Sequence, residues 1–322
     1  MTSPRTVLVT GAAGFVGANL VRRLVEGGHA VHMLLRPETA RWRLDDVAAD
    51  ARTVEADLRD EDAVRAVVRS VRPAWIFHLA AHGAYSWQDD ARRIFDTNLT
   101  GTVNLLDAAL ETGVGAFVHA GSSSEYGAVD HAPDEEERLD PNSDYGIAKA
   151  AATMYCRRRA READAHVVTL RLYSVYGPWE DPRRLLPRLI ACGRQGFLPP
   201  LAAPGTARDF VYVDDVVDAL LMAAERDDLS RGHILNVGSG TQTTLREAVQ
   251  TVQATLGFRA EPHWGTGDAR PWDTDTWVAD IARIRTETGW EPRTSLADGI
   301  RATTHWLDSR PRHAARYDAP AN

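Results

Sequence analysis

A tyrosine and a lysine four positions apart are the residues of this chain best suited to chemistry. Lys149 is the single lysine among the 37 basic residues of the sequence, and Tyr145 precedes it by four positions. Side chains at this spacing share one face of a helix, so the ammonium group can favour the phenolate and lower the tyrosine pKa from about 10. A tyrosine tuned in this way is a general acid and base for reducing a carbonyl or oxidising an alcohol.

Three glycines near the N-terminus predict a binding site for a dinucleotide. Gly11, Gly14 and Gly17 follow an apolar run at 6–10, expected as a strand, and open a helical pattern over 14–26. Glycines at this spacing let the backbone turn sharply, approach a pyrophosphate and pack the helix close to the strand. The pyrophosphate then lies at a helix N-terminus, where free N–H groups and the helix dipole favour an anion. The alternative is a tight strand-to-helix turn without a ligand.

The end of the second predicted strand indicates which dinucleotide binds. An acidic residue there would bond the ribose hydroxyls of NAD and repel a 2′-phosphate. This chain instead has Leu35 followed by Arg36, so a guanidinium stands where a 2′-phosphate would lie. We expect NADP(H), with NAD(H) as the alternative if Arg36 is only a solvated strand end. Asp57 and Leu58, after the third predicted strand, are placed to meet the adenine.

These residues need a parallel sheet covered by helices on both faces. Short apolar runs alternate with segments of helical periodicity, and unbroken apolar strands of this kind are buried on both faces. The expected strands cover 6–10, 30–35, 51–54, 75–79, 116–120 and 167–172, and the expected helices cover 14–26, 61–70, 90–111 and 145–162. The predicted fold class is therefore α/β, a Rossmann-type doubly wound parallel sheet.

The composition and the hydrophobic pattern of the chain change after residue 173. Prolines become frequent and apolar runs become short, which is typical of a smaller, loop-rich portion. We assign 1–173 to a dinucleotide-binding domain, with strands around 206–240 returning to it, and 174–310 mainly to substrate binding. Residues 311–322 are polar and are expected to form a frayed tail.

Composition argues against several classes of function. The formal net charge is −8, so we expect no basic surface for nucleic acid. The sequence has no run of about 18 apolar residues, and we expect no membrane span. Two cysteines are too few for a disulfide framework and suit a reducing cytoplasm. We also expect no metal site.

Several motifs together resemble the extended short-chain dehydrogenase/reductases, in the branch that remodels nucleotide-diphosphate sugars. The resemblance covers nearly the whole chain and rests on the glycine turn, the tyrosine–lysine pair and the serine cluster Gly-Ser-Ser-Ser-Glu-Tyr-Gly at 121–127. Further motifs are His-Leu-Ala-Ala at 78–81, Thr-Asn-Leu-Thr-Gly-Thr at 97–102 and Arg-Asp-Phe-Val-Tyr-Val-Asp-Asp at 208–215. The resemblance implies a homodimer through the predicted helices 90–111 and 145–162.

The resemblance also implies roles for residues around the catalytic pair. It assigns the catalytic hydroxyl to Ser122, with Ser123 as the second choice within the serine run and Glu125 as a further candidate. A hydroxyl there would hold the substrate oxygen beside Tyr145, while Lys149 would also hold the nicotinamide ribose. The other cofactor contacts that it implies are Phe15, Val16, Leu79, Ala80, Ala81, Asn98 and Tyr173.

Most of the implied substrate residues lie in the second portion. Arg208 and Arg270 match positions that clamp the diphosphate, which suits arginine because its planar fork meets two phosphate oxygens at once. Ser174 stands where many relatives have an asparagine that contacts the substrate. The candidate sugar-pocket residues on the loop after the fourth strand are Tyr85, His82 and Trp87.

The choice among reactions depends on the serine cluster and on the cofactor. Relatives that remove water from the sugar carry an acidic pair directly after the catalytic hydroxyl, whereas this chain has Ser123 and Ser124 there. Epimerases of this branch keep NAD, which Arg36 disfavours. A 4-keto sugar reductase using NADPH is therefore the first expectation, a 4-epimerase the second and a 4,6-dehydratase the third. The rival class is a non-catalytic dinucleotide-binding sensor, which can dispense with the tyrosine–lysine pair.

Overall fold

The computed structural model describes residues 3–267 and 274–318 and contains the expected parallel sheet. Among these residues, seven strands pair in the order β3-β2-β1-β4-β5-β6-β10. Their bounds are β1 (Thr6–Thr10), β2 (Ala30–Leu35), β3 (Arg52–Glu55), β4 (Trp75–His78), β5 (Ala116–Ser122), β6 (Val167–Leu172) and β10 (His233–Val237). The order reverses between β1 and β4, and open sheets of this kind bind ligands beyond the carboxyl ends of the strands at such a point.

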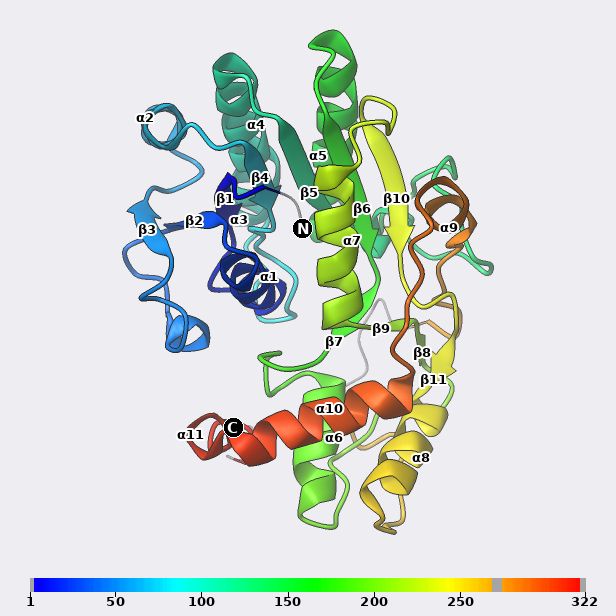
Figure 1. Cartoon of the computed structure of the whole chain (residues 1–322). Coiled ribbons are helices and arrows are strands. Elements are labelled where there is room, and N and C mark those ends of the chain that lie inside the picture. Colours follow the sequence, from blue (N-terminus) through cyan, green and yellow to red (C-terminus); the bar gives the residue numbers. More distant parts are fainter. Residues whose placement is uncertain (1–2, 268–273, 319–322) are drawn as a thin grey trace.

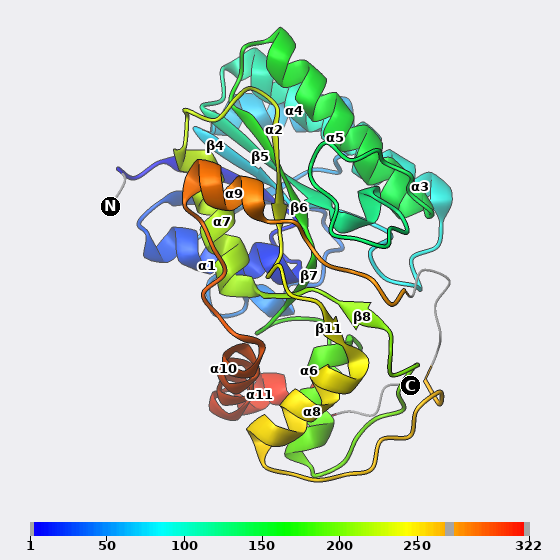
Figure 2. The same cartoon turned by 90° about the vertical axis from the view of Figure 1, so that its right-hand side faces the viewer.

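Helices cover both faces of this sheet (Figures 1 and 2). On one face, α1 packs against α7, and on the other, α2 packs against α4 with α5 beside them. The bounds of these helices are α1 (Phe15–Glu26), α2 (Glu61–Val71), α4 (Gly101–Thr112), α5 (Asp144–Glu162) and α7 (Val213–Glu225). In the described part of the chain, no helix combines the length and apolar character needed to cross a membrane.

Each face of the sheet buries its own apolar cluster. Successive side chains of a strand point to opposite faces. In β1, Val7 and Val9 accordingly join the cluster that holds Leu220 of α7, whereas Leu8 joins the cluster that holds Leu105 of α4. The side chains of Val7, Leu8 and Val9 are all fully buried. This alternation explains why the first strand reads as an unbroken apolar run, and the α/β prediction is confirmed.

The helix expected over 90–111 is interrupted. The chain forms α3 (Ala91–Phe95), a π-helical turn η2 (Asp96–Thr100) and then α4. Within this turn, the side-chain amide of Asn98 accepts a hydrogen bond from the backbone N of His82 at 2.8 Å and donates one to its carbonyl oxygen at 2.7 Å. Single π turns are often found at functional sites. The apolar pattern gave no sign of this turn because its residues keep helical character.

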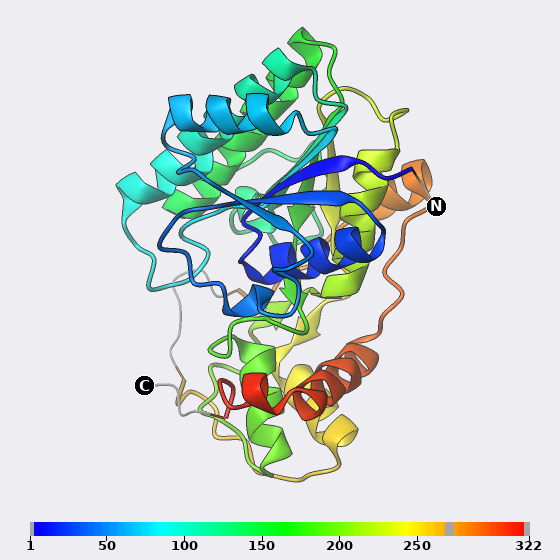
Figure 3. The same cartoon turned by 60° about the vertical axis from the view of Figure 1, so that its left-hand side comes forward.

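The second portion stands below the sheet in Figures 1 and 3. Its helices are α6 (Leu185–Arg194), α8 (Leu245–Leu256), α10 (Leu296–Ser309) and α11 (Pro311–Ala314). A third apolar cluster joins them and includes Leu189, Val249 and Ile300. Two pairs of short strands border this portion, β7 (Ser174–Tyr176) with β9 (Phe210–Tyr212) and β8 (Ala207–Arg208) with β11 (Thr243–Thr244). The remaining elements are η1 (Trp42–Leu44), η3 (Ser123–Glu125) and α9 (Ala282–Thr288).

Residues 311–318 are packed against the protein, although the sequence leads us to expect a frayed tail from residue 311. Ala314 and Tyr317 are each 6% exposed. The Tyr317 hydroxyl donates a hydrogen bond to the carbonyl oxygen of Glu180 at 2.7 Å. The tail therefore docks through two apolar anchors set among polar residues, a pattern that average polarity does not reveal.

Candidate active site

Three adjoining cavities lie beyond the carboxyl ends of the strands. The central cavity is lined by Gly11, Gly14, Phe15, Val16, Gly17, Leu79, Ala81, Tyr85, Ser122, Ser123, Tyr145, Lys149, Tyr173, Ser174 and Arg208, among other residues. The rim cavity is lined by Arg36, Asp57, Leu58, Leu79, Ala80 and Ala81, among other residues. The outer cavity shares Ser174 and Arg208 with the central cavity. The fold thus brings together most of the residues that the sequence analysis assigns to catalysis, cofactor binding and substrate binding.

The glycine turn separates the central cavity from the rim cavity. Gly11 has a φ of +69°, and a Cβ there would lie 2.6 Å from the backbone of Leu79 and Ala80. A Cβ on Gly17 would lie 2.2 Å from the carbonyl oxygen of Gly11. Gly14 caps the N-terminus of α1 without a side-chain hydrogen bond, so the first-turn N–H groups remain available to an anion. The turn therefore has the close packing and the donors that a pyrophosphate requires.

The rim cavity holds the residues expected at the adenosine end. Arg36 follows β2 and forms an ion pair with Glu38, with 3.4 Å between Nη1 and Oε1. Asp57 accepts hydrogen bonds from both the backbone and the side chain of Arg59, and these lower the pKa of the Asp57 carboxyl. Leu58 is buried beside them. Arg36 therefore already pairs with a carboxylate, which weakens the argument that it awaits a 2′-phosphate.

Tyr145 and Ser122 meet in the central cavity. Tyr145 lies in the first turn of α5, Ser122 ends β5, and both side chains line this cavity. Burial raises the pKa of Tyr145 to about 12, while the Ser122 hydrogen bond and the positive charge of Arg184 act in the opposite direction. The resemblance predicts that Ser122 holds the substrate oxygen beside Tyr145, and the fold brings both side chains to one cavity.

Lys149 lies one helical turn after Tyr145 and is 2% exposed. Its Nζ donates a hydrogen bond to the carbonyl oxygen of Ala120 at 2.8 Å. Burial lowers the pKa of Lys149 to about 8. An ammonium group has three N–H donors, and the bond to Ala120 uses one of them. The sequence expects Lys149 to lower the Tyr145 pKa, and this effect of Lys149 stays a prediction.

Glu125, the further catalytic candidate, is a structural residue. It is fully buried, and its Oε1 accepts hydrogen bonds from the backbone N of Ser122 at 2.8 Å and from the hydroxyl of Thr153 at 3.0 Å. Its Oε2 lies 2.8 Å from Nε of Arg171, which is also buried. These partners hold the end of β5 in position. Because every one of them faces away from solvent, Glu125 is not available to exchange protons with a ligand.

Other predicted residues also differ from their expected positions. Asn98 is fully buried, and its side-chain amide bonds the His82 backbone and so holds the cavity wall, while its contact with the cofactor stays a prediction. His82 lines the rim cavity and not the central one. Tyr85 lines the central cavity, and Trp87 stacks on it with 4.7 Å between ring centroids. Trp87 is itself 43% exposed, so it supports Tyr85 from outside.

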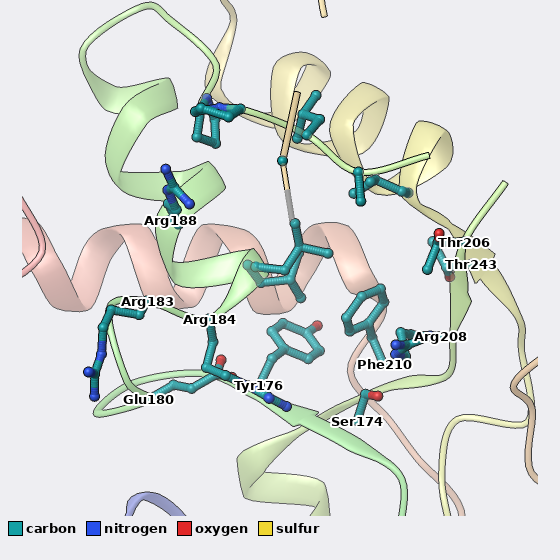
Figure 4. A pocket seen from close by; sticks show the side chains of 18 of the residues that line it. Ser174, Tyr176, Glu180, Arg183, Arg184, Arg188, Thr206, Arg208, Phe210 and Thr243 are labelled. Atoms are coloured by element: carbon teal, nitrogen blue, oxygen red, sulfur yellow. The ribbon is translucent and has the colours of Figure 1, made fainter. Parts of the chain in front are cut away.

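The outer cavity lies between the β7 strand and helix α6 (Figure 4). Arg208 lines both the outer and the central cavity, and its guanidinium lies 5.3 Å from the ring centroid of Trp277. Ser174 also lines both cavities. A long ligand can therefore extend from Tyr145 past Ser174 to Arg208. The second predicted diphosphate residue, Arg270, lies outside the described residues.

Two functional candidates were missed by the sequence reasoning. Glu180 and Arg184 line the central and outer cavities together. They belong to the run Gly-Pro-Trp-Glu-Asp-Pro-Arg-Arg at 177–184, which directly follows β7. The signal was available, since charged residues and two prolines after a strand mark a loop at a ligand-binding edge.

Comparison with protein-family models identifies the relevant family. The model described as the NAD dependent epimerase/dehydratase family matches residues 7–238. This span contains the glycine turn, the serine cluster, the tyrosine–lysine pair and Arg208.

Individual relatives cover nearly the whole chain. A UDP-glucose 4-epimerase of Mycolicibacterium smegmatis is 31% identical over 94% of this chain and 98% of its own length. A dTDP-glucose 4,6-dehydratase of Streptomyces griseus is 31% identical over 93% of each chain. The crystal structure of UDP-glucose 4-epimerase from Thermus thermophilus in complex with NAD superimposes with a TM-score of 0.82 and 31% identity, covering 93% of this chain and 97% of that one. These relatives favour epimerases and dehydratases over the 4-keto reductase that the sequence put first.

Proposed function

This chain belongs to the NAD-dependent epimerase/dehydratase family, and on that basis we propose that it epimerises a nucleotide-diphosphate sugar at C4. The proposed cofactor is NAD. Support for NAD over NADP comes from the NAD bound to the Thermus thermophilus relative. The NADPH-dependent reductase, first among the expectations from sequence, becomes the less favoured reading.

The residues present fit a bound dinucleotide. The glycine turn and the free N–H groups of α1 would hold the pyrophosphate, and the rim cavity would take the adenosine. Lys149 and Tyr173 line the central cavity, where the nicotinamide ribose would lie. When bound, the cofactor supplies a ring that accepts a hydride and returns it.

Tyr145 is the proposed proton carrier. Its phenolic oxygen takes the proton of the C4 hydroxyl as that carbon is oxidised to a ketone, and returns the proton when the ketone is reduced again. Ser122 holds the same substrate oxygen by a hydrogen bond. The bond between Ser122 and Tyr145 and the charge of Arg184 both favour the phenolate, which opposes the effect of burial on the Tyr145 pKa.

The residues directly after Ser122 favour an epimerase over a dehydratase. Removing water from a sugar needs a base to take a proton from carbon and an acid to protonate the leaving hydroxyl. At the two positions after Ser122 this chain has Ser123 and Ser124, whose hydroxyls do not titrate in the working range. The next residue, Glu125, is committed to Arg171 and the β5 end. This single observation carries the proposal.

The proposed substrate lies with its diphosphate near Arg208 and its sugar between Ser174 and Tyr145. Arg208 lines both cavities, so its guanidinium can meet phosphate oxygens from a ligand that spans them. The relatives named above act on UDP-glucose and dTDP-glucose, and we propose a pyrimidine nucleotide carrying a neutral hexose.

The test has two measurements on the wild-type protein. Denaturing the purified protein should release NAD. Incubating it with UDP-glucose, and separately with dTDP-glucose, should give the C4 epimer of one of them without consuming added cofactor, as followed by NMR. A 4-keto-6-deoxy product would identify a dehydratase, and NADPH consumption with a 4-keto sugar would restore the reductase. Either result would overturn the proposal.

A further inference from the structure

Glu180 is a buried carboxyl group on the wall between the central cavity and the outer cavity. It lines both cavities and is 5% exposed. It lies in the loop between β7 and α6. Figure 4 shows it beside Arg184 at one end of the outer cavity, with Arg208 toward the other. The carboxyl group thus stands on a wall shared by the cavity that holds the catalytic hydroxyls and the cavity that Arg208 also lines.

One oxygen of this carboxyl group has no partner. Oε1 lies 3.6 Å from Nε of Arg184, which is longer than a hydrogen bond. Oε2 is buried and has no hydrogen-bond partner among the residues that the structure describes. Rotation about the last side-chain bond exchanges the two oxygens, so either one can face the cavities. Buried polar atoms are nearly always bonded, so an unbonded carboxyl oxygen in a residue that lines both cavities suits a ligand hydroxyl.

The surroundings of Glu180 keep it neutral near pH 7. Burial raises the pKa of the Glu180 carboxyl to about 8, against the opposing positive charges of Arg184 and Arg43. A protonated carboxyl group can both donate and accept a hydrogen bond. The charged and titratable groups that face it are Arg184, Asp181, Arg43, Tyr85, Tyr176 and Tyr317.

The backbone on either side fixes the position of Glu180. Trp179 has a φ of 73°, in the left-handed region, and is 2% exposed. Its ring packs on Trp306 and His313, with centroids 4.9 and 4.5 Å away. The Tyr317 hydroxyl bonds the Glu180 carbonyl oxygen. A bulky residue holds such a backbone only where its neighbours impose it, and such positions cluster at functional sites.

We propose that Glu180 recognises the sugar of the substrate by hydrogen-bonding one of its ring hydroxyls. This inference rests on the proposed nucleotide-sugar substrate and adds a specificity residue to the same site. A ring hydroxyl matches the neutral carboxyl group because each partner is both a donor and an acceptor. The parent nucleoside diphosphate lacks the hexose that Glu180 would bond, so its affinity should be independent of this residue.

The experiment compares the binding of a nucleotide sugar with that of its parent nucleotide by calorimetry. UDP-glucose is paired with UDP, and dTDP-glucose with dTDP. Glu180→Leu should weaken the binding of the sugar nucleotide about tenfold and leave the parent nucleotide unchanged within about twofold. The matched variant Glu180→Gln keeps the shape and both hydrogen-bonding roles, so it should stay within about threefold of wild type. Thermal unfolding of both variants shows that they fold.

Binding as a function of pH gives a second readout. Ionisation removes the donor of Glu180, so the affinity of the wild type for the sugar nucleotide should fall as the pH rises through about 8. Glu180→Gln should lack that part of the pH dependence, while any part that comes from Lys149 remains in both proteins. Binding of the parent nucleotide should not show the pH dependence that comes from Glu180, either in the wild type or in Glu180→Gln.

Several outcomes would overturn the inference. Glu180→Leu could weaken both members of a pair equally or neither of them, or wild type could bind no sugar nucleotide more tightly than its parent. The inference is judged on binding alone. A wild type that shows the predicted Glu180 dependence but does not epimerise its ligand would contradict the proposed reaction and leave the recognition role supported.

Discussion

The two halves of this protein build their binding surfaces in different ways. For the pyrophosphate, the cofactor half uses backbone from one short segment, since the turn between β1 and α1 supplies both the close approach and the N–H donors. The substrate half uses side chains from distant segments. The β7–β9 and β8–β11 pairs bring residues 174–176 to 210–212 and 207–208 to 243–244. Local spacing therefore encodes the first surface, and only the tertiary fold creates the second.

This difference predicts that the halves respond separately to mutation. A change in the glycine turn should affect the cofactor and spare the nucleotide sugar. A change at Arg208 should do the reverse. Tyr145 stands where the two surfaces meet, so its loss should stop turnover while sparing both ligands. Three variants test this separation, in order of decreasing effect.

Tyr145→Phe should have the largest effect. The substitution removes the proposed proton carrier and should lower kcat by about 10²–10⁴-fold, because a positioned general acid–base group contributes about that much. NAD content and the Kd for UDP-glucose should change little. Steady-state rates, together with the nucleotide released on denaturation, measure both quantities.

Tyr155→Phe is the matched control on the same helix. It removes a hydroxyl bonded to Asp107 at 2.8 Å, away from the cavities, and should keep wild-type turnover. Full activity of Tyr145→Phe would contradict the assignment of Tyr145 as the proton carrier.

Gly17→Ala should have the next largest effect, confined to the cofactor half. Its Cβ would lie 2.2 Å from the Gly11 carbonyl oxygen, so the turn must shift. Overpacking of this kind costs about 2–3 kcal/mol, or about 100-fold in NAD affinity if the distortion falls on the binding loop. Titration of apoprotein with NAD measures the loss.

Gly205→Ala is the control, because a Cβ there meets no atom within 4 Å. If Gly17→Ala also weakened UDP binding to the same extent, the two halves would not be independent.

Arg208→Gln should have the smallest of the three effects, confined to the substrate half. Glutamine keeps one donor and loses the charge, so KM for the nucleotide sugar should rise about tenfold. NAD content should stay at the wild-type level. Arg259→Gln, at a position outside these cavities, controls for the loss of one positive charge. A fall in NAD content in Arg208→Gln would break the separation of the halves.

The same contrast explains what the sequence could predict. The alternation of strands and helices, the glycine turn and the shared helix face of Tyr145 and Lys149 can be read from spacing and periodicity, because each depends on local sequence. The place of Ser122 comes instead from the resemblance to a family. The burial of a side chain and its contacts with residues far away in the sequence cannot be read in this way. From the sequence, Glu125 is a candidate acid near Ser122. The structure shows that its carboxylate accepts a hydrogen bond from Arg171, which lies 46 residues later. The sequence likewise does not reveal the π turn at Asn98 or the hydrogen bond between its amide and the His82 backbone.

The bond between Tyr317 and Glu180 has a consequence for the order of events during synthesis. These residues are 137 positions apart, so the Glu180 loop emerges from the ribosome long before its anchor does. The glycine turn and the first parallel strands can form while translation continues. The wall that carries Glu180 must wait for Tyr317, which is made 137 residues later. A nascent chain would thus acquire its cofactor pocket well before its sugar pocket is complete.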